Sequence, residues 1–270
     1  MNKINGNFLD IGYMDTLACA DSPVHRLDPR AKLIATFVFI VTVVSFDRYA
    51  ISGLLPFFIF PVVMISVAGL PARYILRKVL LISPFAILIA ICNPFLDRSI
   101  LFHVGGINIS GGWVSFISIL LRFFLTVTAA LVLVASTGFN AVCLALSKLG
   151  LPKPFVMQLL FLYRYIFVLL EETERLVRAR ALRSFSGTAM KLTTFTSLIS
   201  HLLLRTLDRA QRIYLAMCCR GFDGNVRLIR SMKKGRSEII FVAGWSVLFI
   251  ILRYWNIPLH VGALITRRSL

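Results

Sequence analysis

Two runs of the sequence end in an arginine followed by a small residue, and their spacing suggests a chemical role. These endings are Arg183-Ser184 and Arg220-Gly221, and each follows a helix-like run with acidic residues near its start. Such a charge order complements the helix dipole, and Glu171 and Arg175 have the spacing of a helical ion pair. Each arginine can bind a partner's carboxylate through two hydrogen bonds, or it can simply complement the dipole and contact lipid phosphates. The spacing alone favours the second interpretation.

The other reactive residue types form no recognisable catalytic or metal-binding group in the sequence. A cobalt or nickel site needs converging ligands, whereas the four histidines are spread over the chain: His25, His103, His201 and His260. The five cysteines contain no C-x-x-C pair and are expected to be apolar fillers. No P-loop motif of the form G-x-x-x-x-G-K-S/T occurs. The sequence therefore predicts a non-catalytic chain that binds no metal or cofactor itself.

The elements that position these residues are predicted to be membrane helices. The chain has 270 residues, is 58% hydrophobic and 16% charged, and has a mean hydropathy of +0.82. Soluble domains carry about 25% charged residues, so the long apolar runs indicate an all-α, polytopic integral membrane helical bundle. The net charge of +18 is better explained by basic cytoplasmic loops than by a nucleic-acid partner. Residues 1–29 lack an apolar core, so we predict no cleavable signal peptide.

Five segments are predicted to cross the bilayer, which needs about 17–25 residues per helix. They are Ala31–Phe46, Tyr49–Leu70, Val79–Phe95, Trp113–Thr137 and Ile239–Trp255. The first is slightly short, and Arg30 and Lys32 are expected to extend it by snorkelling to the surface. Pro56 and Pro61 are expected to kink the second span, and Pro94 to close the third.

Basic residues in the connecting segments predict the orientation. The positive-inside rule places the N-terminus in the cytoplasm, because basic residues precede the first span and fill the loop before the third. Residues 138–237 then return to the cytoplasm with 17 Lys and Arg against 5 Asp and Glu. We therefore predict a cytoplasmic segment 1–30, a four-helix transmembrane region 31–137, a cytoplasmic domain of long amphipathic helices 138–237, and a final membrane helix with its tail, 238–270. Arg267 and Arg268 would lie outside, a mild conflict with the rule.

Two further apolar stretches, Phe155–Leu170 and Leu198–Leu204, leave the number of spans open. If only the first crossed the membrane, the basic residues from Arg175 onward would face outward, against the charge rule. If both crossed, the rule would be kept in part. We interpret them as parts of long amphipathic helices at or beneath the membrane, which gives five spans.

Arg122 is a charged residue within the predicted fourth span. It lies about 13 Å into its helix at 1.5 Å per residue, near the middle of the bilayer. An isolated charge at this depth is unfavourable and is usually paired or exposed to water. It is therefore a candidate either for orienting the helix against a partner subunit or for pairing inside the bundle.

Five short motifs, in this order along the chain, resemble the CbiQ family, the transmembrane (T) components of energy-coupling-factor transporters for cobalt. The resemblance covers roughly residues 20–237. The motifs are Asp21-Ser22-Pro23-Val24-His25-Arg26-Leu27-Asp28-Pro29-Arg30-Ala31-Lys32-Leu33, then Leu149-Gly150-Leu151-Pro152, then Tyr163-Arg164-Tyr165, then Arg178-Ala179-Arg180-Ala181-Leu182-Arg183-Ser184, and Ala216-Met217-Cys218-Cys219-Arg220-Gly221-Phe222-Asp223-Gly224.

The resemblance implies that two cytoplasmic coupling helices insert their tips into a dimer of ABC-type ATPases. The tips are then Arg183-Ser184 and Arg220-Gly221, supported by Arg178, Arg180 and Ala216. It further implies a separate membrane subunit that binds cobalt, and partner ATPases that bind ATP and Mg²⁺. Leu182 and Cys219 depart from the family pattern, which often has alanine there.

The expected function is therefore that of a T subunit that transmits ATP-driven motion in the bacterial cytoplasmic membrane. Nickel or vitamin import by the same class of transporter is the alternative. From the residues alone, a stand-alone secondary transporter, a membrane-embedded enzyme and a membrane-tethered nucleic-acid binder stay open as less favoured functions.

Overall fold

The computed structural model describes residues 12–47, 50–96, 100–104, 107–183, 192–224 and 235–254. These residues form an all-α membrane protein, as predicted, with one short β-hairpin. The chain divides into two compact units, of which the first contains the residues up to Ala145 together with the last helix. The second begins at Leu146 and consists of two long helices.

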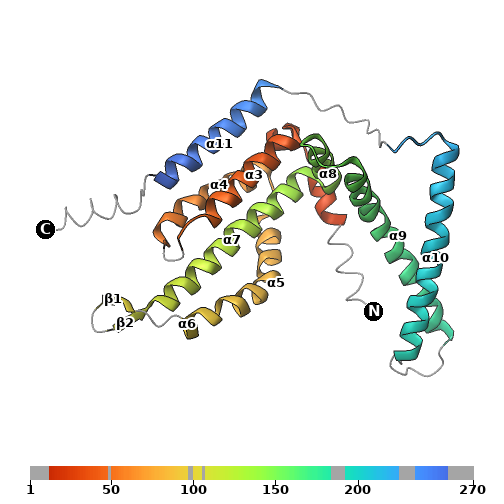
Figure 1. Ribbon diagram of the computed structural model, residues 1–270, viewed down its shortest axis with the longest axis horizontal. Coiled ribbons are helices and arrows are strands. Elements are labelled where there is room, and N and C mark those ends of the chain that lie inside the picture. The colour runs from red at the N-terminus through yellow and green to blue at the C-terminus, as the bar shows by residue number, and fades with distance from the viewer. Residues whose placement is uncertain are drawn as a thin grey trace. The chain divides into compact units, whose positions relative to one another are not determined.

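The first unit is built around helix α7 (Gly111–Thr137), which crosses its middle (Figure 1). Its partners are α2 (Pro23–Arg26), α3 (Pro29–Val44), the 3₁₀-helix η1 (Ser52–Phe58), α4 (Ile59–Ala68), α5 (Ala72–Ala90) and α6 (Cys92–Leu96). The last helix, α11 (Arg236–Tyr254), packs on α3 and η1. Small buried residues on α7 such as Ser118 and Ala129 let the neighbouring backbones approach closely.

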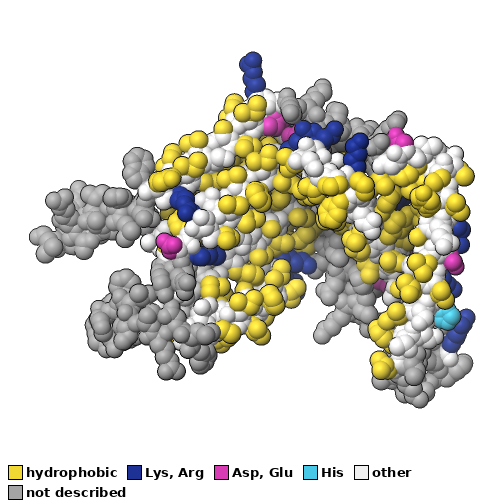
Figure 2. All heavy atoms as spheres, in the orientation of Figure 1, with side chains coloured by type: hydrophobic (Ala, Val, Ile, Leu, Met, Phe, Trp, Pro, Cys, Tyr) yellow, Lys and Arg dark blue, Asp and Glu magenta, His cyan; other side chains and the backbone are white. Residues whose placement is uncertain are grey.

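The centre of the first unit is a cluster of aromatic rings. Phe39 of α3 lies 4.7 Å from Phe60 and 5.3 Å from Phe249, measured between ring centroids. Trp245 packs edge-on against Phe60, and Phe57 also contacts this group. Hydrophobic side chains also cover much of the outer surface in Figure 2. A unit that is apolar both inside and outside is typical of a lipid environment.

Four described helices are long and apolar enough to cross a membrane: Ala72–Pro94, Gly111–Thr137, Lys153–Arg183 and Arg236–Tyr254. Three of them coincide with most of the predicted third, fourth and fifth spans, although the third begins seven residues earlier than predicted, at Ala72 rather than Val79. Trp255, the predicted last residue of the fifth span, lies outside the described residues. The third candidate span ends at Pro94, the residue predicted to close it, although the chain continues as the short helix α6 to Leu96. Pro56 lies in the 3₁₀-helix η1, which precedes α4, so the predicted second span is not a regular α-helix at this proline. Pro61 lies in the first turn of α4, where a proline is tolerated.

The start of α3 shows why the motif around Asp28 suits a helix end. The Asp28 carboxylate accepts a hydrogen bond of 2.9 Å from the Arg30 amide, and Pro29 occupies the first turn. Lys32 does not snorkel to the surface as we expected. It is 1% exposed, and its Nζ donates to the backbone oxygen of Ser136 at the end of α7, 2.9 Å away. The prediction was wrong because an unpaired helix-terminal carbonyl lies within reach of the ammonium group.

An antiparallel hairpin between α6 and α7 was not predicted. Its strands are β1 (Ile100–Val104) and β2 (Ile107–Ser110), with Phe102 opposite Ile109. The helix α7 follows directly, so Gly111 and Gly112 are its first residues rather than a separate turn.

Helices α9 (Lys153–Arg183) and α10 (Leu192–Cys219) form the second unit, and α8 (Phe139–Lys148) precedes them. The apolar stretches Phe155–Leu170 and Leu198–Leu204 lie within these two helices, as parts of longer amphipathic ones. Because α9 also has the length and composition of a membrane span, the total of five spans stays a prediction.

Candidate coupling surface

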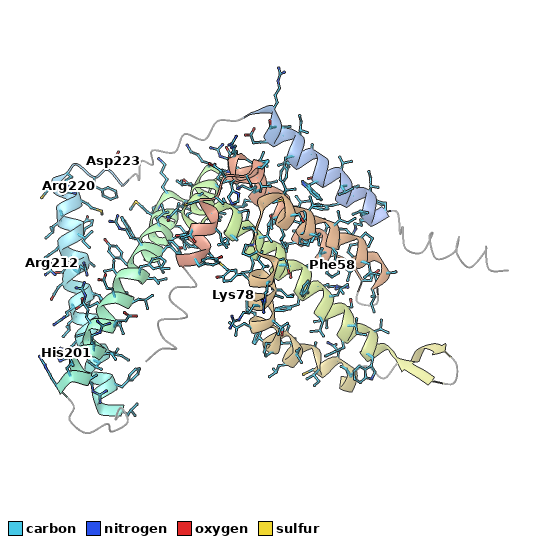
Figure 3. The ribbon with its side chains drawn as sticks, turned by 180° about the vertical axis from the view of Figure 1, so that it is seen from behind. Phe58, Lys78, His201, Arg212, Arg220 and Asp223 are labelled. Carbon is cyan, nitrogen blue, oxygen red and sulfur yellow. The ribbon has the colours of Figure 1, made fainter. Side chains whose placement is uncertain are left out.

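Helices α9 and α10 pair in opposite directions (Figures 1 and 3). In the second half of α9, the Glu172 carboxylate accepts a hydrogen bond of 2.6 Å from Arg205 in the middle of α10, and the two side chains form an ion pair. Nearer the start of α9, Tyr165 and Met217 of α10 line a shared apolar groove. The end of α10 therefore lies toward the start of α9.

A second groove between the two helices is strongly charged. Its lining consists of Leu169, Glu172, Arg205, Thr206, Asp208, Arg209, Arg212, Ile213 and Ala216. Ala216, predicted to support a coupling tip, thus lies one turn before the end of α10 and beside this groove. On α9 itself, Arg175 donates to Glu171 over 2.6 Å, which confirms the ion pair predicted from their spacing.

The end of α10 has the hydrogen bonds of a Schellman motif. The Phe222 amide donates to the Met217 carbonyl and the Gly221 amide to the Cys218 carbonyl. Gly221 has φ +74°, in the left-handed region that favours glycine. Arg220 is exposed at this helix end, and Figure 3 shows it at the end of α10, beyond Arg212 and His201. The Arg220-Gly221 step is therefore a helix tip.

The other predicted tip lies at the end of α9. Arg183 is the last residue of the helix and is exposed, and Leu182 before it is 78% exposed. Arg178 is exposed and Arg180 half-buried in the preceding turns. Ser184, the second residue of this tip, lies outside the described residues. A leucine so exposed beside an arginine is available to a partner surface.

The structure does not bring the two tips together. Because α9 and α10 are antiparallel, Arg183 and Arg220 lie toward opposite ends of the pair. The 28 residues of α10 correspond to about 42 Å at 1.5 Å per residue. The second unit therefore offers two separate cationic contacts rather than one joint site.

Arg122, in the first unit, is held by the backbone. Its guanidinium donates to the Asp47 carbonyl, in the connection that follows α3. Arg253 of α11, which sequence reasoning missed, donates to the Thr42 and Ser45 carbonyls over 3.3 and 3.2 Å and lies over the Phe46 ring. Two arginines thus bind carbonyls at and just after the end of α3. For Arg122, this supports pairing inside the bundle rather than contact with a partner subunit.

Among the described residues, no group of three or more His, Cys, Asp or Glu side chains is placed to hold a metal ion. His25 instead has a structural position: its Nδ1 lies 2.7 Å from the Ser22 hydroxyl and its Nε2 3.1 Å from the Leu17 carbonyl. Burial, together with the positive charge of Lys32, lowers the pKa of His25. His25 therefore links the start of α2 to the residues that precede it.

The comparisons with known proteins agree with this architecture. The family model "CbiQ: Cobalt transport protein" matches residues 20–232. The chain belongs to the CbiQ family. It is 28% identical to the energy-coupling factor transporter transmembrane protein EcfT of Heliobacterium modesticaldum, over 87% of this chain and 94% of the relative. It is also 28% identical to EcfT of Bacillus subtilis, over 75% of this chain and 82% of that protein.

The CbiQ-like motifs now have structural roles as helix boundaries. In Leu149-Gly150-Leu151-Pro152, the Leu151 amide donates to the Leu146 carbonyl and Gly150 has φ +105°, which ends α8. The Pro152 carbonyl then accepts from the first turn of α9. Three of the five motifs therefore stand at ends of the two long helices: one at the start of α9, one at its end and one at the end of α10.

Proposed function

We propose that this CbiQ-family chain is the T subunit of an energy-coupling-factor importer for cobalt ions. In this proposal it transmits the ATP-driven motion of an ABC-type ATPase dimer to a membrane subunit that binds the ion. The family description and the names of the relatives support the proposal. The chain acts as a lever with no catalytic residue of its own, and the partner ATPases bind ATP and Mg²⁺.

The observation that carries the proposal is the separation of two exposed arginine tips on one pair of helices. A dimer of ATPases has two subunits, so contact with both needs two separate tips rather than one. Within the described residues, no ion pair or hydrogen bond uses the side chain of Arg183 or Arg220. Each guanidinium is therefore available to bind a carboxylate on its own ATPase subunit in bidentate fashion.

The long helices can carry motion from these contacts. Helix α9 runs unbroken for 31 residues, and α10 for 28. The bond between Glu172 and Arg205 links them where they pass each other. When ATP binding closes the ATPase dimer, the two tips shift relative to one another, and the helices pass that shift to the membrane bundle.

A double charge reversal, Arg183→Glu with Arg220→Glu, tests the coupling role. We expect the ATPases to be lost on purification of the complex, and ATP-dependent uptake of radioactive cobalt into cells to fall to background. The matched control is Arg175→Glu with Arg212→Glu, which reverses the same charge at an exposed arginine about two turns before each tip. An intact complex with unchanged uptake in the tip variant would refute the coupling role.

Cobalt is proposed as the substrate because the matching family model describes cobalt transport proteins. If the complete transporter takes up nickel or a vitamin but not cobalt, the proposed substrate is wrong. The proposed coupling role would be unaffected by that result.

The proposed orientation puts the N-terminus and both tips in the cytoplasm of a bacterial cell. Cys218 and Cys219 are exposed next to the second tip. An impermeant thiol reagent should therefore modify them only after the cells are opened. Their modification from outside intact cells would exclude contact with a cytoplasmic ATPase.

A further inference from the structure

Helix α5 carries a surface groove with two chemically different halves. Its lining consists of Pro71, Arg73, Tyr74, Leu76, Arg77, Leu80, Leu81 and Pro84, all in or next to the first three turns of the helix. The half near the helix start contains the arginines, and the half further along contains leucines and a proline. The coupling role proposed above uses none of these residues.

The first half is a concentrated positive charge. Arg73 and Arg77 are four residues apart, so they point from the same face of the helix. Lys78, labelled in Figure 3, adds a third charge and lies 5.5 Å from the centre of the Tyr74 ring. The sequence contains no Asp or Glu between Asp47 and Asp97. No ion pair in the described part of the chain involves Arg73 or Arg77.

The second half is an exposed apolar strip. Leu80 is 66% exposed and Leu81 74% exposed, so the first unit leaves both side chains uncovered. Pro84 has no amide to donate to the Leu80 carbonyl, but the Ser83 hydroxyl donates to it over 2.9 Å. The strip therefore presents no unpaired Leu80 carbonyl to an apolar ligand.

The two halves together have the polarity of one lipid molecule, with a binding site for a charged head group next to an apolar strip. Pro84 lies about 10 Å further along the helix than Arg77, and the helix continues into a segment long and apolar enough to cross a membrane. We infer that the groove binds an anionic phospholipid, with its phosphate between Arg73 and Arg77 and one acyl chain along Leu80, Leu81 and Pro84. The predicted orientation puts the arginines at the cytoplasmic face, where anionic lipid is available.

Charge and shape both favour a lipid over a soluble anion. A free phosphate would use only the arginines and leave the leucine strip exposed, whereas a zwitterionic lipid would fill the strip but carries no net negative charge for the arginines. An anionic phospholipid satisfies both halves, and each basic residue near an anionic membrane surface contributes about a fivefold gain in affinity.

The test measures lipid binding to the purified full-length chain by native mass spectrometry. The detergent-solubilised protein is titrated with phosphatidylglycerol and, separately, with phosphatidylcholine of the same acyl chains. We expect tighter binding of phosphatidylglycerol, and a loss of about 30-fold in its affinity in Arg73→Gln with Arg77→Gln. The matched control, Lys148→Gln with Lys153→Gln, removes two positive charges from exposed lysines elsewhere and should bind phosphatidylglycerol like the parent.

A second variant tests the apolar half independently. Leu80→Ala with Leu81→Ala keeps the arginines and should still weaken phosphatidylglycerol binding at least threefold, while the melting temperature stays near that of the parent. Three results would overturn the inference: unchanged affinity in the arginine variant, equal binding of the two lipids by the parent, or full displacement of the lipid by 10-fold excess inorganic phosphate.

Discussion

The buried ammonium group of Lys32 is the feature of the first unit whose removal gives the sharpest prediction. Both Lys32 and Ser136 are 1% exposed, and the Nζ of Lys32 donates to the Ser136 carbonyl over 2.9 Å. Helix α7 ends at Thr137, so this carbonyl has no partner within the helix. The Val134 carbonyl, by contrast, accepts from the Gly138 amide. Lys32 thus pairs a carbonyl at the negative end of the α7 dipole.

Lys32→Met keeps the length and the apolar stem of the side chain but removes its charge. Replacing a buried charge by an apolar group can be neutral when both partners are replaced. Here the Ser136 carbonyl stays, so the variant leaves it buried without this hydrogen bond. A hydrogen bond to a charged group contributes about 1.5–3 kcal/mol. We therefore expect a loss of about 2 kcal/mol, equivalent to a fall of roughly 4–8 °C in melting temperature for a chain of this size.

Thermal unfolding of the purified chain in detergent, followed by circular dichroism, measures this loss. Lys148→Met is the matched control, because Lys148 is exposed at the end of α8. The melting temperature of this variant should differ from that of the parent by less than about 1 °C. If Lys32→Met melts within that margin of the parent, or above it, the Ser136 carbonyl does not depend on Lys32. Other contacts would then hold α3 and α7 together at this junction.

Two further predictions concern the ends of helices. The lowered pKa of His25 means that the unfolded chain binds a proton below about pH 6.5 while the folded chain does not. The free energy of unfolding should therefore decrease as the pH falls from that value toward the folded-state pKa, and His25→Gln should flatten this dependence in melting curves measured at several pH values. Gly221→Ala places a side chain at φ +74°, at a cost of roughly 1–2 kcal/mol in local helix-end stability. Hydrogen exchange should show faster opening of the last turn of α10, whereas Gly12→Ala, at a glycine without positive φ, should leave that turn unchanged.

The sequence predicted several helices, the end of α10 and one ion pair because these features depend on residues close together in the chain. The first span was predicted to begin at Ala31, two residues after the first residue of α3, where Asp28 caps the helix and Pro29 suits its first turn. Gly221 supplies the left-handed residue that ends α10. The ion pair between Glu171 and Arg175 likewise follows from spacing within one helix.

The features that the sequence did not reveal depend on residues far apart in the chain. Lys32 is buried because the end of α7 lies beside it, and Ser136 is more than one hundred positions away. Arg253 bonds to carbonyls of α3 for the same reason. No local pattern around either residue distinguishes it from a snorkelling side chain.

Two other features do have local signals in the sequence. Gly105-Gly106 separates two runs rich in branched and aromatic residues, which is a hairpin pattern. The short stretch between Arg183 and Leu192 favours antiparallel helices, and this direction places the two arginine tips at opposite ends.

The antiparallel direction of α9 and α10 makes the distance between the tips a matter of residue count. Each tip ends its own helix, so shortening α10 by seven residues would draw Arg220 back by about 10 Å and leave Arg183 where it is. The lengths of the two helices therefore set the distance between the tips, and each length can change independently. Under the proposed coupling role, a chain altered in this way would suit an ATPase dimer with more closely spaced binding grooves, and insertion of seven residues would suit a wider one.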